Sequence, residues 1–221
     1  GPLSKRPNAV WCKKAPLYVT KWVTTYIRAQ GMSDAALLIL LHQLLFQGMF
    51  FIKNISLRRK LGKPIRGANA EATLSIGFFV IFIGISLYFA WTGNAVGSVQ
   101  VLSGQIALVL GVLLMLANLI VGLASLKDLG DSWRVGVIEE QQTTLVEDGI
   151  YRFTRNPYFL AYLLLFAAYT VLLQNAVLLG LSCIGFGMIH AMILREEKYL
   201  AMTHGSAYQA YRARVPRYLL L

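Results

Sequence analysis

The sequence predicts an all-α, polytopic membrane protein with about five transmembrane helices, and its composition and the spacing of its apolar runs support this. Of the 221 residues, 57% are hydrophobic and only 14% are charged. The mean hydropathy of the whole chain is +0.57, and the apolar residues gather in runs of membrane-spanning length. A soluble domain of this size contains more charge, so the composition excludes that class of protein.

The five predicted spans follow one another along the chain, and the last two form a helical hairpin. Each is an apolar run of about the length that a hydrocarbon core of ~30 Å requires. Only Gln174 and Asn175 separate the last two runs, which predicts a tight turn. The third run is the longest and is expected to tilt or to extend beyond the membrane. The predicted spans are residues 35–52, 72–91, 99–126, 158–173 and 176–194.

The N-terminal segment, residues 3–33, is basic and amphipathic, and it follows two residues, 1–2, that resemble a protease-cleavage scar. Drawn as a helix, residues 16–30 place Tyr and Trp side chains on one side and Lys and Arg on the other. This pattern predicts a helix that lies in the membrane interface as an anchor, and the alternative is a lid over the substrate entrance. We expect no cleavable signal peptide, because the first long apolar run lacks a small-residue cleavage site.

Basic residues in the loops predict the orientation of the spans. The loop at residues 53–71 carries six Lys and Arg residues, and the loop at residues 92–98 carries none. With five spans, the basic loop, the loop at residues 127–156 and the C-terminal tail share one side, which we assign to the cytoplasm. The basic N-terminal segment then lies opposite, so either the rule fails here or the span count is off by one. The net charge of +11 indicates anionic lipid headgroups rather than nucleic acid as the partner.

Two polar motifs flank the hairpin, and a hairpin returns the chain to the side it left, so both motifs are expected to meet on one membrane face. Polar and ionisable groups at the ends of membrane helices are costly, which makes them candidates for a functional site. The first motif contains Leu145, Val146, Gly149, Tyr151 and the run Arg155-Asn156-Pro157-Tyr158. The second contains Arg195-Glu196-Glu197, Leu200, Gly205, Tyr208, Tyr211 and Val215-Pro216-Arg217.

Each motif has a structural interpretation beside the functional one. Asn is a favoured N-cap and Pro a favoured first helical residue, so Asn156 and Pro157 predict a helix start. The same helix N-terminus offers free backbone N–H groups to a ligand. At the other motif, Arg195 could extend to lipid headgroups. However, the adjacent carboxylates of Glu196 and Glu197 near a helix C-terminus oppose the helix dipole, which favours function.

The order of these motifs resembles the integral-membrane methyltransferases of the isoprenylcysteine carboxyl methyltransferase and phospholipid methyltransferase type. Their signature is Leu-Val-x-x-Gly-x-Tyr, Arg-His-Pro-x-Tyr, a hairpin, Glu-Glu-x-x-Leu, Gly-x-x-Tyr-x-x-Tyr and a closing Val-Pro-Arg. The resemblance covers residues 130–217, and Asn156 stands where the best-known members have His. A Gly-x-x-Trp stretch at residues 130–133 is common in bacterial relatives, so a bacterial inner membrane is favoured over the endoplasmic reticulum.

The resemblance implies methyl transfer from S-adenosylmethionine to a lipid-like or other amphiphilic acceptor, by a methyltransferase core at residues 127–221 that follows the spans within residues 34–126. Leu200 keeps the Glu-x-x-Leu register with Glu197, so Glu197 is the favoured partner for the amino-acid end of the cofactor. Arg195 and Glu196 are assigned to catalysis, with Arg195 orienting an anionic acceptor. The resemblance assigns the remaining cofactor contacts to Leu145, Val146, Gly149, Tyr151, Arg155, Asn156, Pro157 and Tyr158.

Other functions remain open at this point. Membrane sterol reductases share the Arg-His-Pro-x-Tyr helix entry and use a nicotinamide cofactor, and a non-catalytic subunit or transporter would need neither cofactor. Within the methyltransferase hypothesis, the absence of a strong general base favours a carboxylate or thiolate acceptor over a neutral alcohol. His42 and His190 are expected to hydrogen-bond neighbouring helices rather than to bind metal. The glycines at 180, 185 and 187 are expected to allow close helix packing.

Overall fold

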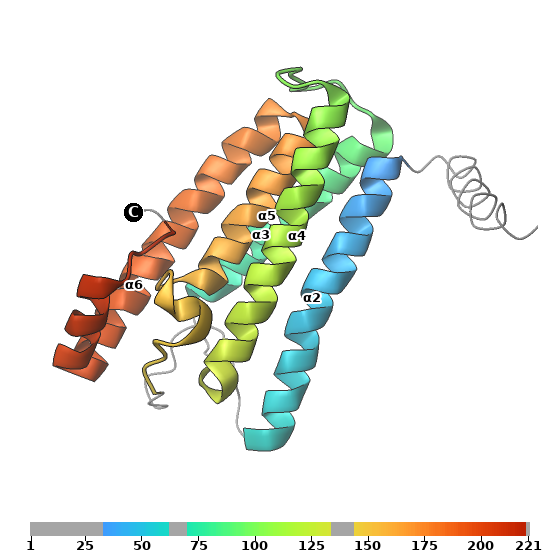
Figure 1. Cartoon of the computed structure of the whole chain (residues 1–221). Helices are drawn as coiled ribbons and strands as arrows, with labels where there is room; N and C mark the ends of the chain where they lie inside the picture. Colours follow the sequence, from blue (N-terminus) through green and yellow to red (C-terminus); the bar gives the residue numbers. More distant parts are fainter. Residues whose placement is uncertain (1–32, 62–69, 134–143, 220–221) are drawn as a thin grey trace, which may run out of the picture.

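The computed structural model describes residues 33–61, 70–133 and 144–219, and in these residues the chain is built from helices, as predicted (Figure 1). The predicted interfacial helix at residues 16–30 lies outside the described residues. The elements are α2 (Asp34–Leu61), α3 (Ala70–Thr92), α4 (Gly104–Leu129), η1 (Gly130–Ser132), η2 (Gly149–Arg152), α5 (Pro157–Leu173) and α6 (Ala176–Arg214).

Four of these helices, α2, α3, α4 and α6, are long and apolar enough to cross a membrane. Helix α5 is apolar but has only 17 residues. At a rise of 1.5 Å per residue it measures about 25 Å, slightly less than the hydrocarbon core. The prediction of about five membrane helices is therefore confirmed in the sense of four long spans and one short apolar helix beside them.

Three predicted boundaries were wrong. Polar residues extend α2 and α6 beyond their predicted ends, and α4 begins later than predicted. Helix α2 runs on to Leu61, and its last turn carries Arg58, Arg59 and Lys60, where cations favour the helix dipole. Helix α6 does not end before the second motif but carries it, to Arg214. Helix α4 begins at Gly104 rather than at residue 99, because the Ser103 side chain caps it.

Helices α4 and α5 pack closely through a stripe of small residues on α4. Its buried positions include Ala107, Gly111, Gly122 and Ser125. A Cβ atom added at Gly111 would lie 2.9 Å from the Cβ of Leu172, so only glycine fits there. Small residues let membrane helices approach until backbone and side-chain atoms interlock, which is how such helices associate without a hydrophobic driving force.

Buried polar side chains add hydrogen bonds between the helices. The Nδ1 atom of His42 lies 2.8 Å from the hydroxyl of Tyr169, and Gln43 donates to the same hydroxyl at 2.7 Å. The Nδ1 atom of His190 lies 2.9 Å from the hydroxyl of Tyr218. The expected bond to a neighbouring helix is therefore confirmed for His42, whose partner Tyr169 lies on α5, whereas the partner of His190 lies in the chain after α6.

The predicted close packing of three glycines in α6 holds for one of them. A Cβ atom at Gly185 would lie 2.6 Å from the ring of Phe166, so a larger residue would push α5 away. Among the described residues, no atom lies within 4 Å of a Cβ atom added at Gly180 or Gly187, so the expected packing is not seen there. These two glycines face away from the described helices.

The turn between α5 and α6 lies at one end of the bundle and is hydrogen-bonded to the connection between α3 and α4. Gln174 takes a left-handed conformation with φ of 45°, and the side chain of Asn175 caps α6. Asn175 also donates to the carbonyl of Val96 at 2.9 Å, and Ala176 N–H donates to Gly97 at 2.7 Å. The two polar motifs lie at the opposite end of the bundle (Figure 1).

We expect Gly111→Ala to destabilise the protein, because the new methyl group would overlap Leu172 in the α4–α5 contact. Overpacking of this kind costs about 1–3 kcal/mol. Thermal unfolding in detergent, followed by circular dichroism, measures the change. The matched control is Gly180→Ala, where open space and better helix propensity predict a gain of about 0.5–1 kcal/mol. Equal melting temperatures for the two variants would contradict the packing account.

Candidate active site

The two polar motifs lie side by side, so the expectation that the hairpin brings them together is confirmed. The hydroxyl of Tyr211 donates to the carbonyl of Tyr151 at 2.8 Å. The backbone N–H of Arg155 donates to the carbonyl of Pro216 at 3.0 Å. Thr154 donates from its hydroxyl to the carbonyl of Arg217 at 2.9 Å. The first motif is therefore hydrogen-bonded to the chain that follows α6.

A reversal at Gly205 makes this contact possible. Gly205 has φ of 53° and ψ of −124° inside α6, a conformation that is open to glycine but not to other residues. After this residue the chain turns back along the bundle, as the red end of α6 in Figure 1 shows. The turn buries Tyr208 and Tyr211 against Leu145 and Leu200. The sequence Gly-x-x-Tyr-x-x-Tyr therefore builds one wall of the site.

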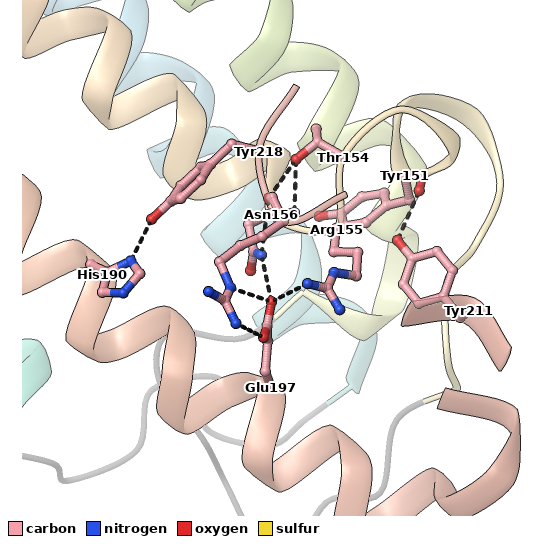
Figure 2. A network of polar contacts seen from close by, with 9 residues as sticks. Tyr151, Thr154, Arg155, Asn156, His190, Glu197, Tyr211 and Tyr218 are labelled. Carbon is pink, nitrogen blue, oxygen red and sulfur yellow. Dashed lines mark hydrogen bonds and ion pairs between the residues drawn. The ribbon is translucent and has the colours of Figure 1, made fainter. Parts of the chain in front are cut away.

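The carboxylate of Glu197 is the centre of the polar contacts, and its residue is only 7% exposed (Figure 2). Arg217 donates to it with two groups, from Nε to Oε1 at 3.1 Å and from Nη2 to Oε2 at 2.8 Å. Arg155 pairs with it through Nη2 at 3.2 Å, and the Asn156 amide donates to it at 3.2 Å. Such a two-pronged arginine contact is among the stronger and more directional hydrogen-bonded pairs.

These partners keep Glu197 ionised. Burial alone would raise the pKa of its carboxyl group, but the hydrogen bond from Arg217, the charges of Arg155 and Arg217 and the Asn156 amide together outweigh burial. The pKa of Glu197 therefore lies below its ordinary value, and the group is negatively charged at neutral pH. Two guanidinium groups compensate this charge inside the protein.

Asn156 occupies the N-cap position of α5, so the predicted helix start is confirmed, but its side chain makes no capping hydrogen bond. Its amide instead donates to Glu197 and, at 3.3 Å, to the carbonyl of Arg217. This contact uses the Nδ2 donor of the amide, whereas a cap would use the side-chain oxygen as acceptor. Pro157 takes the first helical position, as predicted.

A cavity of about 1230 Å³ opens beside the Glu197 cluster and continues between the membrane helices. Its walls further from the cluster are aromatic and come from α2, α3 and α5, with Phe50, Phe79, Tyr162 and Phe166 among them. Its polar end contains eight of the predicted site residues: Leu145, Val146, Tyr151, Arg155, Asn156, Tyr158, Arg195 and Glu196. The predicted residues Gly149, Pro157 and Glu197 do not line it.

Gly149 packs against a neighbouring residue and does not line the cavity. Its φ is +61°, and a side chain there would overlap the carboxylate of Asp128. That carboxylate accepts the backbone N–H of Ile150 at 2.7 Å. The close approach at Gly149 is thus made to Asp128, and it sets the position of Tyr151, whose hydroxyl lies 3.1 Å from Ser125 Oγ.

Among the charged groups that line the cavity, Arg155 and Glu196 are the clearest candidates for contact with a ligand. The Arg155 side chain is 7% exposed, and its Nε and Nη1 atoms are buried without a hydrogen-bond partner in the part of the chain that the structure describes. Buried donors of this kind are costly unless a ligand satisfies them. Burial, reinforced by the charge of Glu197, raises the pKa of Glu196 to about 7.

The sequence analysis did not identify two parts of this site. Arg217 was named only as part of the second motif and given no role, yet it is the main partner of Glu197. Its place in the closing Val-Pro-Arg was the available signal, but the contact depends on the reversal at Gly205. Tyr162 also lines the cavity, one helical turn after Tyr158, with 3.4 Å between the two hydroxyl oxygens. The i, i+4 spacing of these tyrosines could have indicated it.

Comparison with known proteins agrees with this geometry. Residues 106–207 match a family model described as phospholipid methyltransferase. The matched stretch contains most of α4, the first motif, the hairpin and the second motif as far as Ala207. A search of curated proteins found no match. The resemblance noted in the sequence is thus confirmed over residues 106–207, the stretch that matches the phospholipid methyltransferase family model.

Proposed function

We propose that this protein transfers a methyl group from S-adenosylmethionine to an amphiphilic acceptor that carries a carboxylate or thiolate, at the cytoplasmic face of a membrane. The observation that carries the proposal is a cavity that joins a charged end to an aromatic, apolar interior. A polar cofactor suits the charged end at the end of the bundle. A lipid-like chain suits the interior between membrane-spanning helices.

The residues at the polar end fit such a cofactor. The unpartnered Nε and Nη1 groups of Arg155 match a carboxylate, and the carboxylate of Glu196 matches an ammonium. Leu145, Val146 and Tyr151 offer apolar and aromatic surface to an adenosine group. When bound, S-adenosylmethionine supplies a methyl group on a positively charged sulfur. We assign the ammonium contact to Glu196 rather than Glu197, because Glu197 is already held by two guanidinium groups.

Glu197 then acts as a positioning residue. It fixes the guanidinium of Arg155 and the amide of Asn156 in one arrangement before any ligand binds. A group held in advance loses little freedom on binding, and positioning is the main contribution that a protein can make to methyl transfer. We propose that Arg155 and Asn156 bind at the cavity while Glu197 holds them from behind.

Positive charge at the same end suits an anionic acceptor. Arg195 and Lys198 line the cavity together with Arg155 and stand close to the membrane-spanning part of α6. An anionic nucleophile needs no base, since no proton has to leave when its lone pair bonds to the methyl carbon. Attack of an anion on a sulfonium also removes charge, and a cavity shielded from water favours a reaction of that kind.

We expect Glu196→Ala to weaken S-adenosylmethionine binding, because the cofactor's ammonium loses its partner in a partly buried site. Removing one member of such a pair costs about 2–5 kcal/mol. Titration calorimetry on the detergent-purified protein measures the affinity. Glu147→Ala is the matched control, since Glu147 pairs with the exposed Arg214 and does not line the cavity. Equal cofactor affinity for the parent and Glu196→Ala would refute the assignment of the ammonium contact.

We expect Glu197→Ala to unfold more easily than the parent, because Arg155 and Arg217 would face each other without their shared carboxylate. Breaking a buried pair in this way costs about 3–5 kcal/mol. Denaturant unfolding in detergent, with intrinsic fluorescence as the signal, measures the loss. Glu147→Ala again serves as control and is expected to cost about 0–1 kcal/mol, as exposed ion pairs do. A loss for Glu197→Ala no larger than the control's would contradict the positioning role.

Cofactor affinity should rise as the pH increases through about 7, because the pKa of Glu196 lies near that value. Below it the carboxyl group is protonated and cannot pair with an ammonium, and above it the group is ionised and can. Calorimetric titrations between pH 6 and 8, on the parent and on Glu196→Gln, measure the effect, with the window set by the raised pKa. The variant should show a flat profile. A rise of equal size in both proteins would assign the pH dependence to another group.

A further inference from the structure

We propose that the membrane-embedded end of the cavity holds a second, polar subsite, formed by Gln47 and Gln43, that recognises a hydrogen-bonding group in the tail of the acceptor. The inference rests on the proposed function and names the class of acceptor further. The tail would carry a hydroxyl or carbonyl group part of the way along its length. A plain hydrocarbon or isoprenoid tail would leave this subsite unused.

The subsite lies far from the charged end and deep in the membrane-spanning region. Both glutamines line the cavity, and so does Asn54 on the same helix. At 1.5 Å per residue, Gln47 is about 10 Å and Gln43 about 16 Å from Asn54 along α2. By its length and composition the candidate membrane span of this helix is Asp34–Lys60, and Gln47 lies at its middle. The two glutamines are therefore too deep to contact the reacting groups.

Gln43 is the fixed half of the pair. It is buried, and its Nε2 donates to the hydroxyl of Tyr169 at 2.7 Å. The same hydroxyl lies 2.8 Å from Nδ1 of His42 on α2. The Oε1 atom of Gln43 accepts from Nε2 of Gln47 at 3.4 Å. Gln43 thus joins α2 to α5, and it also orients the amide of Gln47.

Gln47 is the half that is open to a ligand. Its side chain is exposed, and in the part of the chain that the structure describes its Oε1 atom accepts no hydrogen bond. The contact between α2 and α5 needs only Gln43 and His42, so helix association does not account for Gln47. A polar side chain at the middle of a membrane span is costly, and such residues usually mark a functional site.

The surroundings favour a lipid tail as the carrier of the recognised group. Between the glutamines and the charged end, the cavity walls include the rings of Phe50, Phe79 and Tyr162. These rings offer apolar surface to a lipid tail but no hydrogen-bond partner to a hydroxyl or carbonyl group on that tail. Such a group finds a partner only at the depth of Gln47. A donor there can bond to Oε1, and an acceptor can bond to the remaining amide N–H.

The test compares binding of radiolabelled palmitate with binding of hydroxypalmitates whose hydroxyl is moved stepwise along the chain. Equilibrium dialysis is carried out with the detergent-purified parent, with Gln47→Leu, and with the control Gln105→Leu on α4, which does not line the cavity. In the parent, the isomer with its hydroxyl at the matching depth should bind about tenfold more tightly than palmitate, as one buried hydrogen bond provides. In Gln47→Leu this ratio should fall to near one, and in Gln105→Leu it should persist.

Equal affinities of all isomers for the parent would overturn the subsite, and so would an undiminished ratio in Gln47→Leu. Methyl transfer from labelled S-adenosylmethionine is measured on the same probes as a separate result. Absence of transfer with the isomer preference intact would count against the proposed function and would leave the subsite standing. Transfer without any isomer preference would support the proposed function and overturn the subsite.

Discussion

The buried carboxylate of Glu197 holds together three segments that are far apart in the sequence. It lies on α6, accepts the amide at the start of α5, and pairs with a guanidinium from each side. A carboxylate this buried is tolerated only because its charge is fully compensated, so its partners cannot be changed one at a time. The start of α5, the last spanning helix and the chain beyond it must therefore take up one relative arrangement. The shape of the charged end of the cavity follows from that arrangement.

The same constraint explains why two neighbouring carboxylates differ. Glu197 faces the arginines, which stabilise its ionised form and lower its pKa. Glu196 lies on another side of the helix and lines the cavity. Burial, together with the charge of the neighbouring Glu197, raises the pKa of Glu196 to about 7. A helix turns by 100° per residue, so adjacent positions face different surroundings. One carboxylate thereby serves the structure, while the other is available to a ligand.

The sequence predicted the helices and the meeting of the two motifs, because apolar periodicity and a two-residue turn are local signals. It also identified eight of the residues that line the polar end of the cavity. It could not separate the residues that line the cavity from those that support it, since Gly149 and Glu197 belong to the same short motifs as their cavity-lining neighbours. It placed Asn156 correctly at the start of α5 but not its contact with Glu197, because that carboxylate comes from a helix later in the chain. The role of Arg217 depends on the reversal at Gly205, which glycine permits but does not require.

The reversal at Gly205 also has a consequence for the order in which the protein is made. Helices α2 to α5 and the apolar first part of α6 precede Gly205, whereas Tyr211 and Arg217, which close the charged end, follow it. The helices can therefore leave the ribosome and enter the bilayer while Glu197 still lacks its principal cation. Until Arg217 emerges, the growing chain holds a carboxylate with only part of its compensation. The apolar helices are thus made before the segment that completes the charged end, and the site is complete only once the chain after Gly205 has folded back onto Glu197.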